Sequence, residues 1–200
     1  MGIYLGLVTL GDENIRRVLD DPPLVWQVIA PDDREFYETA RAEQVTSRPW
    51  WNPFGRGAPR VAADLDLSPA EGIATDVDKA WHGIHYLLTG TAGEGEPPLD
   101  FIVSGGTLVG DLEIGSGPAR VLTAAETLAL RDALDSIGDE ELASRFNPSE
   151  MAALEIYPDI WSGEAAEKES LEYLMEYVRV LRGFLEQTTR ERLGLVLHLA

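Results

Sequence analysis

Short apolar runs and amphipathic stretches alternate along the chain from its beginning. Residues 3–9 are apolar and partly β-branched and end before Gly11, which predicts a buried strand. A short helix is expected to begin at Asp12 and to end before the two prolines at 22 and 23. A second helix is expected over about 32–45.

The pattern marks one helix, over 75–88, more clearly than the others. Thr75 and Asp78 have the spacing of a capping box, with the acid three residues into the helix, and Gly90 is placed to stop it. Apolar and polar residues separate into two arcs on this helix. We therefore expect it to pack against a sheet through its apolar arc.

A β-hairpin is expected after this helix. Residues 99–104 and 107–114 are strand-like, and Gly105-Gly106 between them is a hairpin signal. The rest of the chain predicts three helices and a last strand: a helix from the Thr123/Glu126 capping box to about 136, a helix that begins at Asn147, a long helix over about 164–188, and a strand from Gly194.

The stretch from 47 to 60 differs from its surroundings, because it combines prolines, glycines, arginines and Trp50-Trp51 without periodicity. It reads as an irregular insertion in one domain that spans 1–200. Strands at both ends and a central hairpin, with helices between them, predict an α/β fold in which helices cover a mixed β-sheet.

The composition of the chain limits the classes of partner that the protein is expected to bind. The 35 acidic and 16 basic residues give a formal net charge of −19, which repels nucleic acid and anionic lipid and suits a basic partner or simple solubility. The chain has no cysteine, no apolar run of membrane length and no secretory signal, so we expect a cytoplasmic protein. We expect no cofactor and no tightly bound metal.

Candidate chemistry starts on the polar arc of the 75–88 helix, which carries Asp78, Lys79, His82 and His85. A carboxylate beside an imidazole can fix its tautomer for proton transfer, and two imidazoles on one face can hold a metal. No further ligand accompanies them, so a solvated or structurally hydrogen-bonded polar face explains them as well. On the wheel both histidines project away from Ala80, Ile84 and Leu87.

A second candidate is Arg120, which follows a glycine-rich turn that lacks both the dinucleotide fingerprint and the P-loop pattern. It is either an anion clamp or a buried ion-pair partner. A third candidate segment, 155–161, holds Tyr157, Asp159 and Trp161 on a turn fixed by Pro158. This segment either lines a pocket, together with Trp81 and Lys79, or seals the edge of the core.

The long helix carries two apolar stripes. The second stripe covers either a neighbouring helix or the same helix of another copy, in a homodimer, and consists of Tyr173, Tyr177, Val180 and Phe184.

Four segments resemble the YfbM-like family of bacterial proteins of unknown function: MGIYL at 1–5, DVDKAWHGIHYLLTG at 76–90, GPARVLT at 117–123 and EIYPDIW at 155–161. The resemblance covers most of the chain and implies a three-layer α/β sandwich. It implies no activity.

The residues themselves favour a binding or protein-interaction module, because no catalytic set assembles from them. The alternative is a small enzyme that acts on an anionic small molecule, with His82 and Asp78 as acid–base pair and Arg120 as anion clamp. An enzyme of this kind needs these side chains around one cleft.

Overall fold

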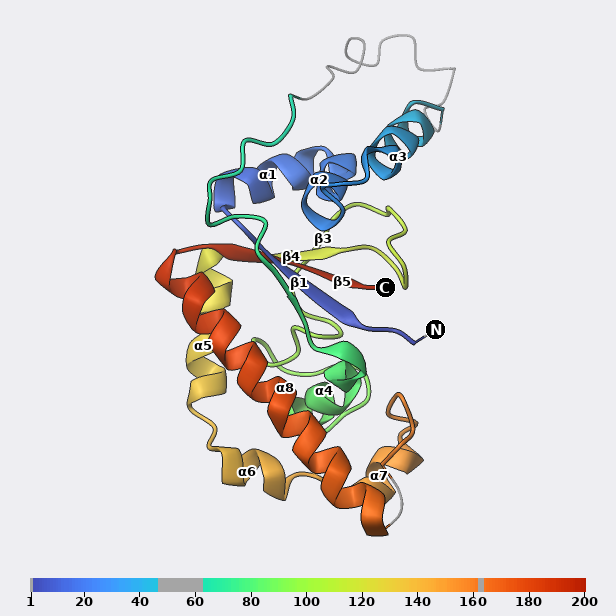
Figure 1. Cartoon of the computed structure of the whole chain (residues 1–200), viewed down its shortest axis with the longest axis vertical. Coiled ribbons are helices and arrows are strands. Elements are labelled where there is room, and N and C mark those ends of the chain that lie inside the picture. The colour runs from blue at the N-terminus through green and yellow to red at the C-terminus, as the bar shows by residue number, and fades with distance from the viewer. Residues whose placement is uncertain (1, 47–62, 162–163) are drawn as a thin grey trace.

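The computed structural model describes residues 2–46, 63–161 and 164–200. The irregular insertion expected at 47–60 lies outside these residues. Within them, helices and strands alternate as an α/β fold requires (Figure 1). None of the described helices is long and apolar enough to cross a bilayer.

The strands form one sheet in the order β2-β1-β5-β4-β3. Its strands are β1 (Leu5–Leu10), β2 (Ala74–Asp76), β3 (Thr107–Leu108), β4 (Arg120–Leu122) and β5 (Gly194–Leu199). The terminal strands lie side by side in its centre, paired from Leu5↔Leu199 to Leu10↔Gly194. Every pair is antiparallel, so the expectation of a mixed sheet was wrong. The relative direction of two strands depends on the path that the connection between them takes. The hydrophobic pattern of the sequence does not encode that path.

Apolar side chains leave both faces of the sheet, because successive residues of a strand point to opposite sides. Leu5 and Leu7 belong to one core cluster, and Val8 and Leu10 belong to another. Helices lie on both sides (Figure 1). On one side are α1 (Asp12–Asp20), η1 (Pro22–Val25), α2 (Trp26–Ile29) and α3 (Arg34–Thr46). On the other are η2 (Asp78–Ala80), α4 (Trp81–Thr89), α5 (Ala124–Asp135), α6 (Asp139–Ser144), α7 (Pro148–Ala153) and α8 (Glu164–Arg190).

The beginning of the helix expected over 75–88 was misplaced. Thr75 pairs with Leu7 in strand β2, and Asp78 has a φ of 45° at the start of η2. The α-helix begins only at Trp81, because sheet pairing of Thr75 outweighs its value as a cap. Its end is as predicted: Gly90 has a φ of 73°, and its N–H bonds to the carbonyl of Tyr86.

The expected hairpin around Gly105-Gly106 was also wrong. Residues 99–104 form turns, and the two-residue strand β3 pairs with β4, which the pattern did not predict. The carbonyl of Asp100 accepts hydrogen bonds from three following amides, which curls the chain instead of extending it. The first and last strands, the capping box of Thr123 and Glu126, the Asn147 cap and the long helix are confirmed.

Candidate functional site

Both ring nitrogens of His82 are occupied by backbone groups. The N–H of Tyr157 donates to Nδ1 at 2.9 Å, and Nε2 lies 2.7 Å from the carbonyl oxygen of Ala92. Because Nδ1 accepts, Nε2 carries the proton and donates, so the imidazole is neutral. Burial lowers the pKa of His82, although the hydrogen bond with Ala92 opposes this. His82 thus joins the loop that follows α4 and the distant turn at Tyr157 to this helix.

An aromatic cluster continues from His82 to the beginning of the chain. The ring of Trp81 stacks on His82 at 4.7 Å and lies 5.8 Å from the ring of Tyr157. Both aromatic side chains bind Ile3, whose carbonyl accepts from Trp81 Nε1 at 3.1 Å and whose N–H donates to Tyr157 Oη at 2.9 Å. Lys79 lies beside Gly2. These four candidates do come together, and the hydrogen bonds of Trp81 and Tyr157 fix Ile3, two residues before β1.

The other candidates of this region have separate partners. Tyr173 Oη donates to Asp78 Oδ2 at 3.0 Å, and burial together with this carboxylate raises the pKa of Tyr173. Trp161 is fully buried, and its Nε1 donates to the carbonyl of Ile156 at 2.6 Å. Asp159 is exposed, with a φ of 61°. Trp161 therefore seals the core, while Asp159 lies at the surface.

Arg120 and His85 lie deeper in the same half of the molecule. Arg120 is buried, and its Nη1 donates to the carbonyls of Phe101 at 2.9 Å and Gly105 at 2.8 Å, while Nη2 donates to that of Ile102. Burial lowers its pKa, against the charge of Asp100. The guanidinium therefore holds the turns of 101–105.

His85 is fully buried, so the arc expected to face away from the core is covered as well. Burial lowers the pKa of His85; a backbone group of Gly93 and the charge of Asp100 oppose this, and the charges of His82 and Arg120 add to it. Despite the nearness of Gly93, neither ring nitrogen has a hydrogen bond of good geometry within the described residues. The charge of Arg120 acts on His85, so the side chains of these two residues lie near each other, in the interior.

A groove on the opposite side of the sheet contains none of these candidates. Its volume is about 550 Å³, and its described lining includes no basic residue. Four carboxylates belong to this lining: Asp33, Glu35, Glu43 and Glu113. Trp26 and Phe36 stack beside them, with ring centroids 4.6 Å apart, and Phe36 is 48% exposed. An adjoining hollow of about 340 Å³ shares Glu43 and Glu113 and adds Asp111. We call the two together the acidic groove.

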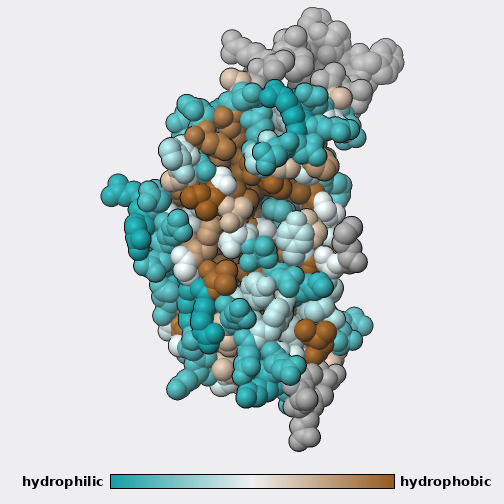
Figure 2. Space-filling view, viewed as in Figure 1, coloured by the Kyte–Doolittle hydropathy of each residue, from teal (hydrophilic) through white to brown (hydrophobic). Residues whose placement is uncertain are grey.

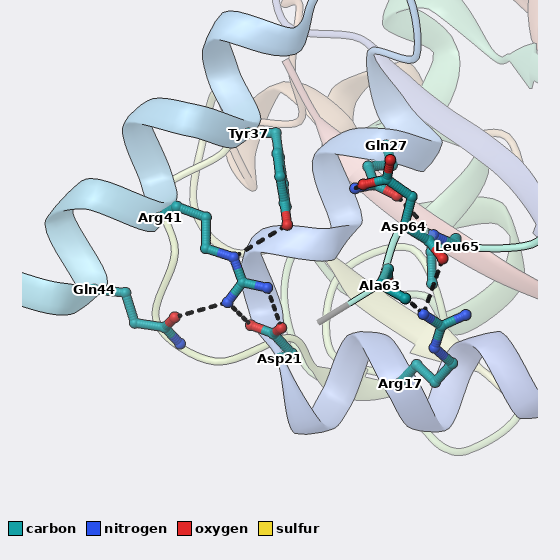
Figure 3. A network of polar contacts seen from close by, with 9 residues as sticks. All are labelled: Arg17, Asp21, Gln27, Tyr37, Arg41, Gln44, Ala63, Asp64 and Leu65. Atoms are coloured by element: carbon teal, nitrogen blue, oxygen red, sulfur yellow. Dashed lines mark hydrogen bonds and ion pairs between the residues drawn. The ribbon is translucent and has the colours of Figure 1, made fainter. Parts of the chain in front are cut away.

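A polar network, drawn in Figure 3, positions helix α3. This helix forms one wall of the acidic groove. Arg41 on α3 donates through both terminal nitrogens to Asp21 after α1, and its Nε donates to Tyr37 Oη at 3.1 Å. Burial disfavours the charged guanidinium, but the hydrogen bonds with Asp21 and Tyr37 outweigh it and raise the pKa of Arg41. The wall is therefore anchored to α1 by a bidentate ion pair.

Residues 1–198 match a protein family described as a domain of unknown function, DUF1877. The chain belongs to the DUF1877 family. Its structure is similar to the crystal structure of YfbM from Escherichia coli, a protein of unknown function, with a TM-score of 0.62 and 18% identity. The similarity covers 98% of this chain and 99% of that one and shows a shared fold. A comparison with curated proteins finds no match.

The resemblance to YfbM-like proteins is thus confirmed, but the acidic groove of this DUF1877 member was missed. Its carboxylates come from the helix expected over 32–45 and from 111–113, about 70 residues later. The only signal in the sequence was the net charge of −19, which does not place the groove. The described residues contain no group of three or more acidic or histidine side chains that could hold a metal ion.

Proposed function

We propose that this protein is a binding module whose acidic groove takes a basic, arginine- or lysine-rich segment of another protein. The observation that carries the proposal is the lining: Asp33, Glu35 and Glu113 contribute carboxylates, and no described residue of the lining is basic. Beside them Trp26 stacks with the exposed Phe36. Carboxylates pair with guanidinium and ammonium groups, and a guanidinium also stacks on an aromatic face. Trp26 and Phe36 supply that face.

Size and charge favour a peptide over a single small cation. The groove and its adjoining hollow have volumes of about 550 and 340 Å³, which is room for several side chains. A net charge of −19 attracts a basic partner from a distance and speeds encounter at low salt. Association should therefore weaken as ionic strength rises.

The enzyme alternative has less support, because its side chains already serve the fold. His82 has both nitrogens bonded to backbone, and Arg120 donates to three carbonyls. Neither residue, nor His85, lines the acidic groove. A reaction that uses these residues stays a prediction.

The homodimer also stays a prediction, and three of its four proposed contact residues are packed within the chain. Phe184 is buried, Tyr173 bonds to Asp78, and Tyr177 packs against the core, which leaves Val180 exposed. On the face of the molecule along which α8 runs, Figure 2 shows mostly hydrophilic residues. Hydrophobic residues gather there at the level of the sheet and of the helices above it. In the three-layer arrangement that we propose, α1–α3 are the binding layer, and the helices across the sheet support it.

The test is fluorescence anisotropy with a labelled peptide that alternates arginine and serine. Changing both Glu35 and Glu113 to Gln should weaken binding at least tenfold, and Phe36→Ala should weaken it severalfold. The matched control changes the exposed Glu140 and Glu191 to Gln, with the same change in charge, and should stay within about twofold. Equal losses in both double variants would show only non-specific attraction and would end the proposal.

A further inference from the structure

A separate cavity of about 380 Å³ lies on the α5 side of the sheet, across from the acidic groove. Its wall is mostly apolar, with Phe101, Leu122 and Leu130 as buried apolar members. Two acidic side chains, Asp100 and Glu126, belong to the same lining, and no described basic residue does. A small organic molecule with one polar end fits such a wall.

One oxygen of Asp100 lacks a partner. The side chain is only 5% exposed; Oδ2 accepts from Ser104 Oγ at 2.9 Å, but Oδ1 has no hydrogen bond to any described residue. Leaving a buried acceptor unsatisfied costs about 1–3 kcal/mol, and more when it is charged. The positive charge of Arg120 acts on Asp100, but the hydrogen bonds of its guanidinium go to backbone carbonyls of the turn. Oδ1 is itself covered by the chain, so it contributes negative charge beside the cavity rather than a direct contact.

The turn around Asp100 holds the carboxylate in place. The carbonyl of Asp100 accepts from the amides of Val103, Ser104 and Gly105 at 3.0–3.1 Å. A Cβ at Gly105 would lie 2.9 Å from Asp100 Oδ1 and 2.7 Å from Phe101 Cα, so only glycine permits this approach. A carboxylate fixed before a ligand arrives loses little freedom on binding.

We infer that this cavity binds a small organic cation, with an ammonium group directed to Asp100 and Glu126 and an apolar body against Phe101, Leu122 and Leu130. Opposite charge favours the ammonium group, and the buried apolar wall favours a compact hydrocarbon body. The site is independent of the acidic groove, because the two share no residue.

The test compares benzylamine with benzyl alcohol, which has the same shape but no charge, by titration of the ¹⁵N-labelled protein. Benzylamine should shift the amide signals of Phe101, Gly105 and Gly106 and bind at least tenfold more tightly than benzyl alcohol. Asp100→Asn keeps the size of the side chain and should remove this preference. Equal binding of the two probes, or shifts confined to the acidic groove, would overturn the inference.

Two further variants keep the test decisive if Asp100→Asn disturbs the turn. Ala129 is exposed at the edge of the cavity, so Ala129→Trp should fold normally and weaken both probes at least tenfold by filling the space. Glu113→Gln, in the acidic groove, should leave benzylamine binding within twofold. Unchanged binding in Ala129→Trp would place the probes elsewhere and contradict the inference, whatever the outcome for the basic peptide.

Discussion

The backbone N–H of Tyr157 donates to His82 Nδ1 at 2.9 Å, although 75 positions separate the two residues in the chain. The opposite ring nitrogen bonds to the carbonyl of Ala92. One imidazole therefore satisfies a donor and an acceptor from two different loops. This requires the neutral form, because a second proton on Nδ1 would face the Tyr157 N–H.

Replacing His82 by leucine should be costly. His82→Leu leaves the Tyr157 N–H and the Ala92 carbonyl without their partner. A buried unpaired group costs about 1–3 kcal/mol, and these two are partly buried, so a loss of about 2–3 kcal/mol in unfolding free energy is expected. Urea unfolding followed by circular dichroism measures it. A loss below about 1 kcal/mol would show that water replaces the imidazole without penalty.

The same change at His85 should cost little. His85 is fully buried without a well-formed hydrogen bond in the described structure, so leucine, which has a similar volume, should change unfolding free energy by less than about 1 kcal/mol. A loss of 2 kcal/mol or more would mean that the interaction of His85 with the backbone of Gly93 is stronger than its geometry indicates.

Acid should expose a further difference at His85. Burial lowers the pKa of His85 in the folded chain below the ordinary 6.5. Its neutral form therefore favours the folded state fully above about pH 6.5, and this stability is lost at lower pH as the unfolded chain takes up a proton. His85→Leu should therefore lose less stability between pH 7 and pH 5.5 than the native chain does.

Glu71 should anchor the beginning of α1. Its Oε1 accepts from the Gly11 N–H at 2.7 Å and from Asn14 Nδ2 at 2.8 Å, and its Oε2 accepts from the Ser68 N–H at 2.8 Å. Glu71→Ala should cost about 1–3 kcal/mol, while Glu13→Ala, an exposed acid of the same helix, should stay within about 0.5 kcal/mol. Equal costs would mean that only the helix dipole matters.

The pH dependence of this contribution has a definite sign. Burial raises the pKa of Glu71, but the hydrogen bonds from Asn14, Ser68 and Gly11 outweigh it and lower the pKa below the ordinary 4.5. The contribution is therefore present above about pH 4.5 and is lost as pH falls further. The difference in unfolding free energy between the native and Glu71→Ala chains should become smaller in urea titrations at acid pH. A difference that stays constant would contradict the role of the ionised Glu71 as an anchor.

Local sequence determined the elements whose causes lie within a few residues. The capping box of Thr123 and Glu126 forms as its spacing predicts, and Gly90 ends α4 because it readily adopts a positive φ. The first and last strands are apolar runs too short for helices, and they pack on both faces. These features, with the motifs of a YfbM-like protein, were sufficient for the α/β class but not for the direction of the strands.

Only the tertiary structure decided the partners of the side chains. Thr75 had the spacing of a cap and became part of a strand, because Leu7 was available to pair with it. His82 lay on the arc read as polar and became a link between loops, and the carboxylates of the acidic groove came together from distant segments. Local spacing sets what a residue can do, but hydrogen bonds and charges act over a few ångströms in space, and folding determines which residues lie within that reach.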